Sequence, residues 1–147
     1  DYDAELKKVA AAREHVRKCA EQGLAAVRMP KAASEDKELL AVARKVLARK
    51  KYGCGKPVRL RINAKVQRKE KREGSITPGT VSSTISVYHY VWDQYQDTTV
   101  EREGDRYWLY ANSLRLYHKG GSTTPTGHWI LANRFRLSPI LEANLDR

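Results

Sequence analysis

The sequence has few of the residues that build disulfide frameworks, metal sites and membrane spans. Only Cys19 and Cys54 are cysteines among 147 residues, and neither a Cys-x-x-Cys nor a His-x-x-x-His spacing occurs. We therefore expect no metal and no disulfide framework. No apolar run approaches the roughly 20 residues that cross a bilayer. Free thiols fit a reducing compartment, so we expect an intracellular location, an organelle included.

Phosphate-binding and cofactor motifs are also missing. The turn Gly53-Cys54-Gly55-Lys56 lacks the strand before it and the helix after it that a phosphate loop requires, so we expect no cofactor. Nearby cations would lower the pKa of an exposed Cys54 thiol, but nothing local supplies a base. The chain begins with Asp1 rather than Met, so we expect processing or a cut upstream, where a targeting segment would lie.

Positive charge is plentiful and unevenly placed. The formal net charge is +11. Residues 1–75 hold 21 basic and 10 acidic side chains, whereas residues 76–147 hold 7 of each. The segment from Arg44 to Arg72 has 13 basic residues and one acid, Glu70. A block this dense attracts phosphate backbones or an anionic surface, although a solvated basic face would look the same.

The first 53 residues have helical periodicity. An apolar stripe that includes Tyr2, Leu6 and Val9 predicts a helix over residues 1–22, with Gly23 as its terminator. Ser34 is a good N-cap for a second helix that runs to about residue 51. Residues 138–147 form a tail. We expect one domain, with a helical part at 1–53 and a sheet at 57–137.

Alternation defines the strands. Val58, Leu60, Ile62, Ala64 and Val66 alternate with basic and amide residues, which predicts one buried and one basic face. Residues 67–74 lack apolar side chains and predict an exposed strand end or a hairpin tip. Further strands are expected at 80–95, 98–103, 106–118 and 128–137, with Gly104-Asp105 as a hairpin turn, a bulge near residue 112, and a stop at 138–139.

These patterns predict an α+β fold with two N-terminal helices packed on a curved antiparallel sheet of about four or five strands. The order of elements, and Trp129 in the final strand, resemble the NTF2-like superfamily and its Tim44-like branch. The resemblance covers about residues 34–137. It implies helices seated in the cup of a curved sheet, and it implies no particular site residue, because that fold serves enzymes and adaptors alike.

A catalytic site is the weakest hypothesis. His89, Asp93 and His118 would form a possible pocket if the sheet brought them together, since a His–Asp pair acts as a general base. Nothing in their spacing requires that, and a lone histidine has many other uses. We therefore expect a protein that is not an enzyme.

Four functions remain open. The first is a non-enzymatic module that binds RNA, or a ribonucleoprotein, through phosphate contacts. The second is a protein–protein adaptor or scaffold that uses aromatic side chains of the sheet, the third an anionic membrane-surface binder, and the fourth a small-molecule enzyme. No RRM signature is present. The proposed nucleic-acid-binding residues are Arg44, Lys45, Arg49, Lys50, Lys51, Arg59, Arg61, Lys65, Arg68, Lys69, Lys71 and Arg72.

Overall fold

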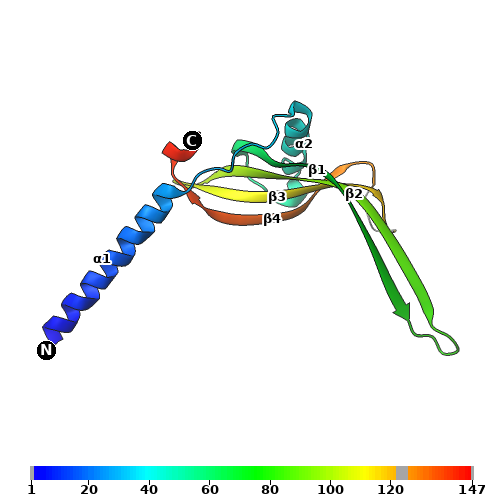
Figure 1. The fold of residues 1–147 in the computed structure, drawn as a ribbon, viewed down its shortest axis with the longest axis horizontal. Helices are drawn as coiled ribbons and strands as arrows, with labels where there is room; N and C mark the ends of the chain where they lie inside the picture. Colours follow the sequence, from blue (N-terminus) through cyan, green and yellow to red (C-terminus); the bar gives the residue numbers. More distant parts are fainter. Residues whose placement is uncertain (1, 122–125, 147) are drawn as a thin grey trace.

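Two helices precede a four-stranded antiparallel sheet. The computed structural model describes residues 2–121 and 126–146. Its strands follow the order β1-β2-β3-β4, each antiparallel to its neighbour (Figure 1). The α+β fold is thereby confirmed. The elements are α1 (Tyr2–Ala26), α2 (Lys37–Leu47), β1 (Pro57–Thr77), β2 (Thr84–Glu103), β3 (Arg106–Lys119) and β4 (Trp129–Ile140), with 3-10 turns at Lys50–Tyr52 and Glu142–Asn144.

Strand β2 is continuous where two strands were expected. Its ladder with β3 continues without a break through the pairs Asp97↔Asn112 and Thr98↔Ala111. No glycine or proline lies between Thr84 and Glu103, so nothing in the chain forces a turn there. The hairpin at Gly104-Asp105 is confirmed, and Gly104 has the positive φ of 63° that such a turn requires.

Helix α2 covers one face of the sheet, which we call the covered face. Its Ala43 and Val46 pack with Ile62, Tyr95 and Leu114 in a buried cluster. Odd-numbered residues of β2 point to this side, as alternation along a strand requires. Tyr95 shows this directly, because its hydroxyl donates to the α2 carbonyl of Leu39 at 2.9 Å.

The start and end of α2 differ from expectation. Asp36, not Ser34, is the N-cap, and its carboxylate accepts from the backbone N–H groups of Glu38 and Leu39. Ser34 instead forms an isolated bridge to Ile62. The helix ends at Leu47, and the Lys50–Tyr52 turn follows as a separate element.

The opposite face, which we call the open face, is covered only at one end. There Met29, Val100, Leu109, Ile140 and Leu145 form a second buried cluster. Even-numbered residues of β2 point to this side. Away from that end the face carries exposed side chains, among them Gln96 and Phe135.

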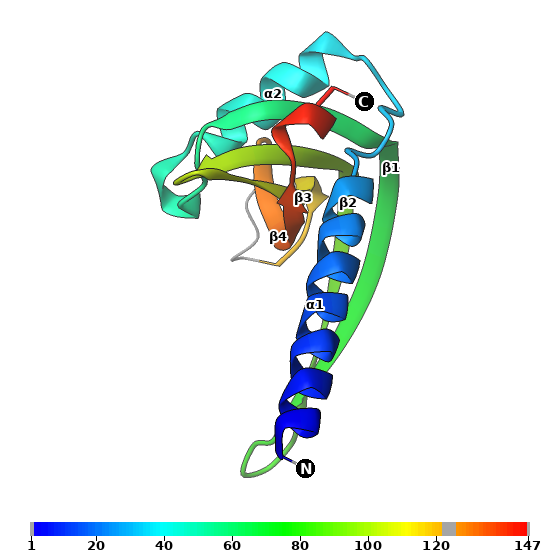
Figure 2. The same cartoon turned by 90° about the vertical axis from the view of Figure 1, so that its left-hand side faces the viewer.

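Helix α1 does not pack on the sheet. This corrects the expectation that both helices do, since only α2 covers a face. It has no buried residue, and Tyr2 and Val16 are 79% and 66% exposed. Gly23 lies inside the helix, not at its end. At 1.5 Å per residue the helix is about 37 Å long. The views show it leaving one end of the sheet as a free rod (Figures 1 and 2).

The hairpin of β1 and β2 extends past the rest of the sheet. Beyond the pair Val91↔Lys119, β2 has no partner in β3, so residues 71–90 form a two-stranded arm. The expected exposed end of β1 is therefore part of this arm. The arm and α1 both extend to the side opposite α2, at the two ends of the open face (Figures 1 and 2).

Irregularities in β1 set the direction of the arm. Between Pro57 and Gln67 the strand advances ten residues while β2 advances seven, from Glu101 to Gln94, with shifts near residues 58, 63 and 65. Extra residues on one strand bend and twist it. They also break the expected single phase of β1, because Val58 and Val66 are 39% and 41% exposed.

Strand β4 carries the register shift that was expected near residue 112 of β3. The ladder shifts between Ser113 and Leu114, where the extra residue is Ala132. Phe135 and Leu137 are consequently exposed, although Trp129 and Leu131 pack on the α2 cluster. The strand also continues through Ser138-Pro139 to Ile140, because an edge strand tolerates a proline.

Candidate nucleic-acid interface

The two faces of the sheet differ in charge. All four acids of β2, namely Asp93, Asp97, Glu101 and Glu103, have odd numbers and therefore point to the covered face. Strands β3 and β4 contain no acid at all. The even-numbered positions of β2 from Tyr88 to Thr98 are aromatic, amide or hydroxyl residues. The open face between the arm root and the Met29 cluster therefore carries no carboxylate from β2, β3 or β4.

Five of the predicted basic residues lie on α2 or the turn after it, on the covered side. Arg49 is structural, because its guanidinium donates to the Trp129 carbonyl oxygen at 2.9 Å. Lys51 lies over the Tyr52 ring. The side chains of Arg44, Lys45 and Lys50 are exposed and make no ion pair within the described part of the chain.

Five further predicted residues on β1 are engaged within the molecule. Arg59 pairs with Asp146 at 2.7 Å, and Arg61 is 3.5 Å from the Pro30 carbonyl oxygen. The remaining contacts are Arg68 with Asp93, Lys71 with Glu73, and Arg72 with Glu70. The pairs of Arg59, Lys71 and Arg72 are exposed on both sides and therefore weak, whereas the Asp93 carboxylate that pairs with Arg68 is largely buried. These ion pairs lower the net positive charge of the segment.

The side chains of Lys65 and Lys69 make no hydrogen bond or ion pair to any described residue. Lys69 is paired across the ladder with Trp92, and Lys71 with Tyr90. The structure thus divides the predicted set between two sides of the molecule and does not bring it together as one patch.

Cationic and aromatic side chains alternate at the root of the arm on the open face. The Tyr88 and Tyr90 rings are 6.5 Å apart, and the Trp92 and Tyr117 rings 5.6 Å apart. The Arg115 guanidinium lies 5.0 Å from the Trp92 ring centre. Tyr88 is 42% exposed, whereas Trp92 is buried beneath its neighbours. We call Lys69, Lys71, Tyr88, Tyr90, Trp92, Arg115 and Tyr117 the aromatic–cation stripe.

Two polar hollows follow the stripe along the open face. The first has a volume of about 160 Å³ and the second about 180 Å³, and Gln94 and Gln96 line both. The first is otherwise lined by Asn63, Ala111, Asn112, Ser113, Asn133 and Phe135, the second by Ala64, Lys65, Gln67, Lys69 and Tyr95. No carboxylate of the described residues lines either hollow, and Lys65 and Lys69 are the only charged residues among those named, so both hollows suit a polar but uncharged planar group beside a phosphate.

The possible catalytic trio is only partly brought together. His118 Nε2 lies 2.7 Å from Asp93 Oδ2, but His89 pairs with Glu70 at 2.5 Å. Hydrogen bonds from Arg68, and secondarily from His118, lower the pKa of Asp93 to about 2. A carboxylate held so firmly in its ionised form is a poor base.

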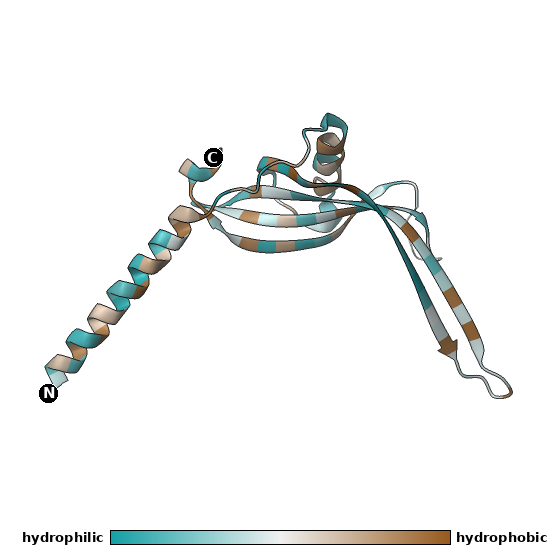
Figure 3. Cartoon of the chain, viewed as in Figure 1, coloured by the Kyte–Doolittle hydropathy of each residue, from teal (hydrophilic) through white to brown (hydrophobic). Residues whose placement is uncertain are grey.

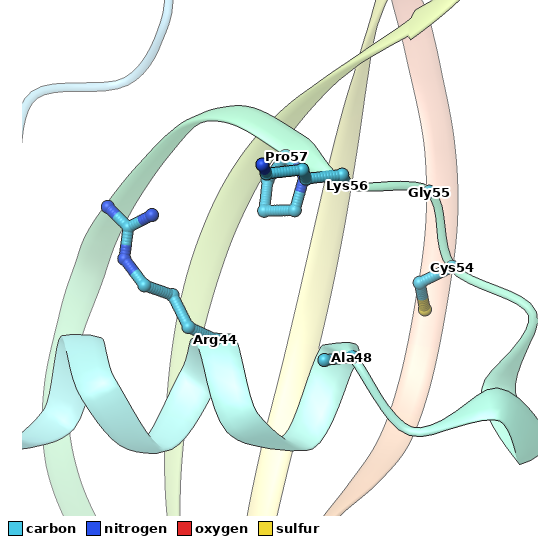
Figure 4. A pocket seen from close by; sticks show the side chains of 6 residues that line it. All are labelled: Arg44, Ala48, Cys54, Gly55, Lys56 and Pro57. Atoms are coloured by element: carbon cyan, nitrogen blue, oxygen red, sulfur yellow. The ribbon is translucent and has the colours of Figure 1, made fainter.

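A larger hollow of about 470 Å³ lies where α2 meets the segment leading into β1. Figure 4 shows Arg44 of α2 and the C-cap residue Ala48 on one side and Cys54, Gly55, Lys56 and Pro57 on the other. Burial raises the pKa of the Cys54 thiol, which corrects the expectation of a thiol acidified by cations. The lining of this hollow consists mainly of aliphatic and backbone atoms, so the hollow does not offer a set of converging polar groups.

Sequence reasoning missed Arg115, Gln94, Gln96 and Asn133, because none lies in the basic segment. One signal was available. Every acid between residues 84 and 103 is at an odd position, and in a single strand that parity places all negative charge on one face.

No family model matches the chain, and no curated protein or solved structure is significantly similar to it. Neither helix is long and apolar enough, over the described residues, to cross a membrane.

Proposed function

We propose that this protein is a non-enzymatic module that binds single-stranded RNA on the open face of its sheet. The observation that supports this most is the placement of charge on the sheet, because the carboxylates of β2 lie on the covered face while cations, aromatic rings and amides line the open face. Of the two acids of β1, Glu73 lies on the open side, where it is the ladder partner of Tyr88 and forms an ion pair with Lys71. Phosphates would contact Lys65, Lys69, Lys71 and Arg115, while bases would stack on Tyr88 and Tyr90. Such stacking contributes about 1–3 kcal/mol per base.

A protein–protein adaptor is the second candidate, and the tip of the arm favours it. Residues 74–87 contain no charged side chain. Ile76, Val81, Ile85 and Val87 are all at least 69% exposed. Hydrophobic bands are visible along the outer part of the arm in Figure 3. Exposed apolar residues grouped in this way are typical of docking surfaces. This candidate predicts binding that depends weakly on salt.

An anionic membrane surface has less support. Along residues 67–94 four basic side chains stand against three acids, and most of them form ion pairs. The long-range attraction of the arm for anionic lipid is correspondingly small. The resemblance to the NTF2-like superfamily stays a prediction. It is supported by the packing of helix α2 on one face of a bent antiparallel sheet.

Fluorescence anisotropy across a salt series tests the proposal. Labelled single-stranded RNA, duplex DNA and vesicles with and without anionic lipid would be titrated with the protein. We expect single-stranded RNA to bind with a steep negative salt slope. The Lys65→Gln, Lys69→Gln, Lys71→Gln triple variant should lower that slope by about 2, because each lost phosphate contact contributes about 0.7 on a single strand.

The matched control removes the same charge from the covered side, through Arg44→Gln, Lys45→Gln and Lys50→Gln. We expect this variant to keep the slope of the unmodified protein. Absence of RNA binding at low salt would refute the proposal. Equal losses in both triple variants would show attraction by net charge alone and would also exclude the open face as the site.

A further inference from the structure

We infer that the two polar hollows are nucleobase pockets, so that the open face selects bases carrying an exocyclic amino group, such as adenine and cytosine, over uracil, which has none. This inference rests on the proposed RNA binding and adds sequence preference to it. Backbone contacts alone carry no sequence information, whereas hydrogen bonds to base edges do.

The lining groups have the chemistry that reads base edges. A side-chain amide presents a donor and an acceptor in one plane, which allows two parallel hydrogen bonds to a base. The side-chain amides of Gln67, Gln96 and Asn133 make no hydrogen bond to any described residue, so they are available to a ligand. No charged side chain of the described residues lines the first hollow, which disfavours a phosphate there and leaves the base as the part of the nucleotide that fits. Lys65 and Lys69 line the second hollow together with its amides, so a base there would lie beside the phosphate that these cations hold.

Hydrogen bonds within the protein decide which atoms of Gln94 and Asn63 remain for a ligand in the first hollow. The Gln94 carbonyl oxygen accepts from Trp92 Nε1 at 3.1 Å and from Arg115 Nε at 2.8 Å. Its amino group is therefore the part left for a ligand, and it must meet an acceptor. Asn63 Nδ2 donates to Thr98 Oγ1 at 2.8 Å, which leaves Asn63 Oδ1 as an acceptor that must meet a donor.

The floor of the first hollow contains unused hydrogen-bonding capacity. Asn63 Oδ1 and Ser113 Oγ are buried and have no partner among the described residues. A buried oxygen without a partner is costly and calls for a donor. A recessed acceptor is reached by an amino group that projects from its ring, as in adenine and cytosine. In uracil the N3–H donor lies between two carbonyl oxygens. If N3–H approached Asn63 Oδ1, these oxygens would come close to another acceptor and repel it.

Phe135 supplies the stacking surface. It lines the first hollow from the edge strand β4 and is 62% exposed. A large apolar ring held open to solvent beside polar groups is suited to cover the face of a base. The ring neighbours the amides that meet the base edge, so one base is held by its face and by its edge together.

The test compares oligonucleotides of one length at one salt concentration: oligo(A), oligo(C), oligo(U) and an abasic strand. We expect oligo(A) and oligo(C) to bind about tenfold more tightly than oligo(U), the scale of one good bidentate contact. The Gln96→Ala, Phe135→Ala double variant should remove that preference and retain the salt slope. Leu137→Ala is the control, because Leu137 is an exposed apolar residue of the same strand that lines neither hollow.

The outcomes separate the two proposals. Equal binding of all four strands with a steep salt slope would overturn the base pockets and leave RNA binding standing. A preference for oligo(U), or a preference that survives the double variant, would likewise overturn this assignment. If no strand binds, RNA binding itself fails, and the base pockets fail with it.

Discussion

Asp97 is a carboxyl group buried in the middle of the sheet. Its side chain has no exposed surface, and its Oδ1 accepts from Asn112 Nδ2 at 2.6 Å while Oδ2 has no partner among the described residues. Burial raises its pKa from the usual 3.8 to about 6, against the opposing effects of Asn112 and Arg134. The protonated form is therefore favoured in the folded protein.

This predicts that stability falls as pH rises from about 4 to 6. Below the pKa of Asp97 in the unfolded chain, both the folded and the unfolded protein bind the proton, and the contribution of Asp97 to the free energy of unfolding is fully present. Above the folded pKa it is lost, about 3 kcal/mol in total for a two-unit difference. Asp97→Asn should flatten this window and raise the free energy of unfolding at pH 7.5 by about 1–3 kcal/mol. Urea unfolding of both proteins at pH 4.5, 6 and 7.5 measures it.

The low pKa of Asp93 acts elsewhere on the pH scale. Its contribution is present above pH 3.8 and is lost only as pH falls toward 2, so it does not overlap with the window of Asp97. An Asp97→Asn protein that keeps the full decline between pH 4.5 and 7.5 would show that other groups cause it.

At the scale of elements, the arm is a hairpin whose outer part buries no side chain in the core. Its side chains from Gly74 to Ile85 are all exposed, and its ladder pairs β1 only with β2. Two-stranded hairpins are marginally stable alone. The arm therefore depends on the sheet for its order, whereas the sheet does not depend on the outer arm.

Shortening the arm should leave the core intact. We expect replacement of residues 74–87 by an Asn-Gly turn, which joins Glu73 to Tyr88, to shift the melting temperature by no more than about 3 °C, because it removes no fully buried side chain. Thermal unfolding followed by circular dichroism is the measurement. A drop beyond about 10 °C would mean that the tip packs against something in solution, as the adaptor candidate requires.

At the scale of the whole molecule, two unequal bodies are joined near Met29. The sheet and α2 contain every residue of the Ile62–Tyr95 cluster, whereas α1 contains no buried residue. Most helical stability in proteins comes from tertiary packing, so α1 has little to hold it.

We therefore expect α1 to open independently of the sheet. Its amides, from Leu6 to Gly23, should exchange with solvent at least about 100-fold faster than those of β2 from Tyr95 to Val100, which form ladders on both sides. Hydrogen–deuterium exchange with mass spectrometry reads both segments at once. Comparable protection of α1 would indicate a partner for its apolar stripe, such as a second copy of the chain.

The elements of the fold that could be predicted from the sequence are those fixed by residues close together in the chain. Alternation around Leu60 and Ile62, the Gly104 turn and the helical stripe at Leu39 are local, and all were predicted correctly. The break expected near residue 97 was wrong, because the strand core there is polar. Asp97, Thr98 and Thr99 are buried and satisfied largely by partners distant in sequence, such as Asn112 and Asn63.

The candidate site was harder to predict because bulges decide which face a residue joins. The extra residues of β1 near positions 63 and 65 cannot be recognised from alternation, so the phase of Lys69 and Lys71 was unknown. Basic composition marked the segment, but it did not distinguish residues engaged in ion pairs, such as Arg59, from Lys69. The contribution of Arg115 required knowledge of the partner strand.

The three-residue excess of β1 affects where the arm points and not which side its residues take. An extra residue in a bulge has no counterpart on β2, so deleting one residue near position 65 would leave the pairs Gln67↔Gln94 and Lys69↔Trp92 in place and would reduce the bend and twist of the strand. Chain length at this point therefore tunes the angle between the arm and the rest of the sheet, while Lys69 and Lys71 stay on the open face.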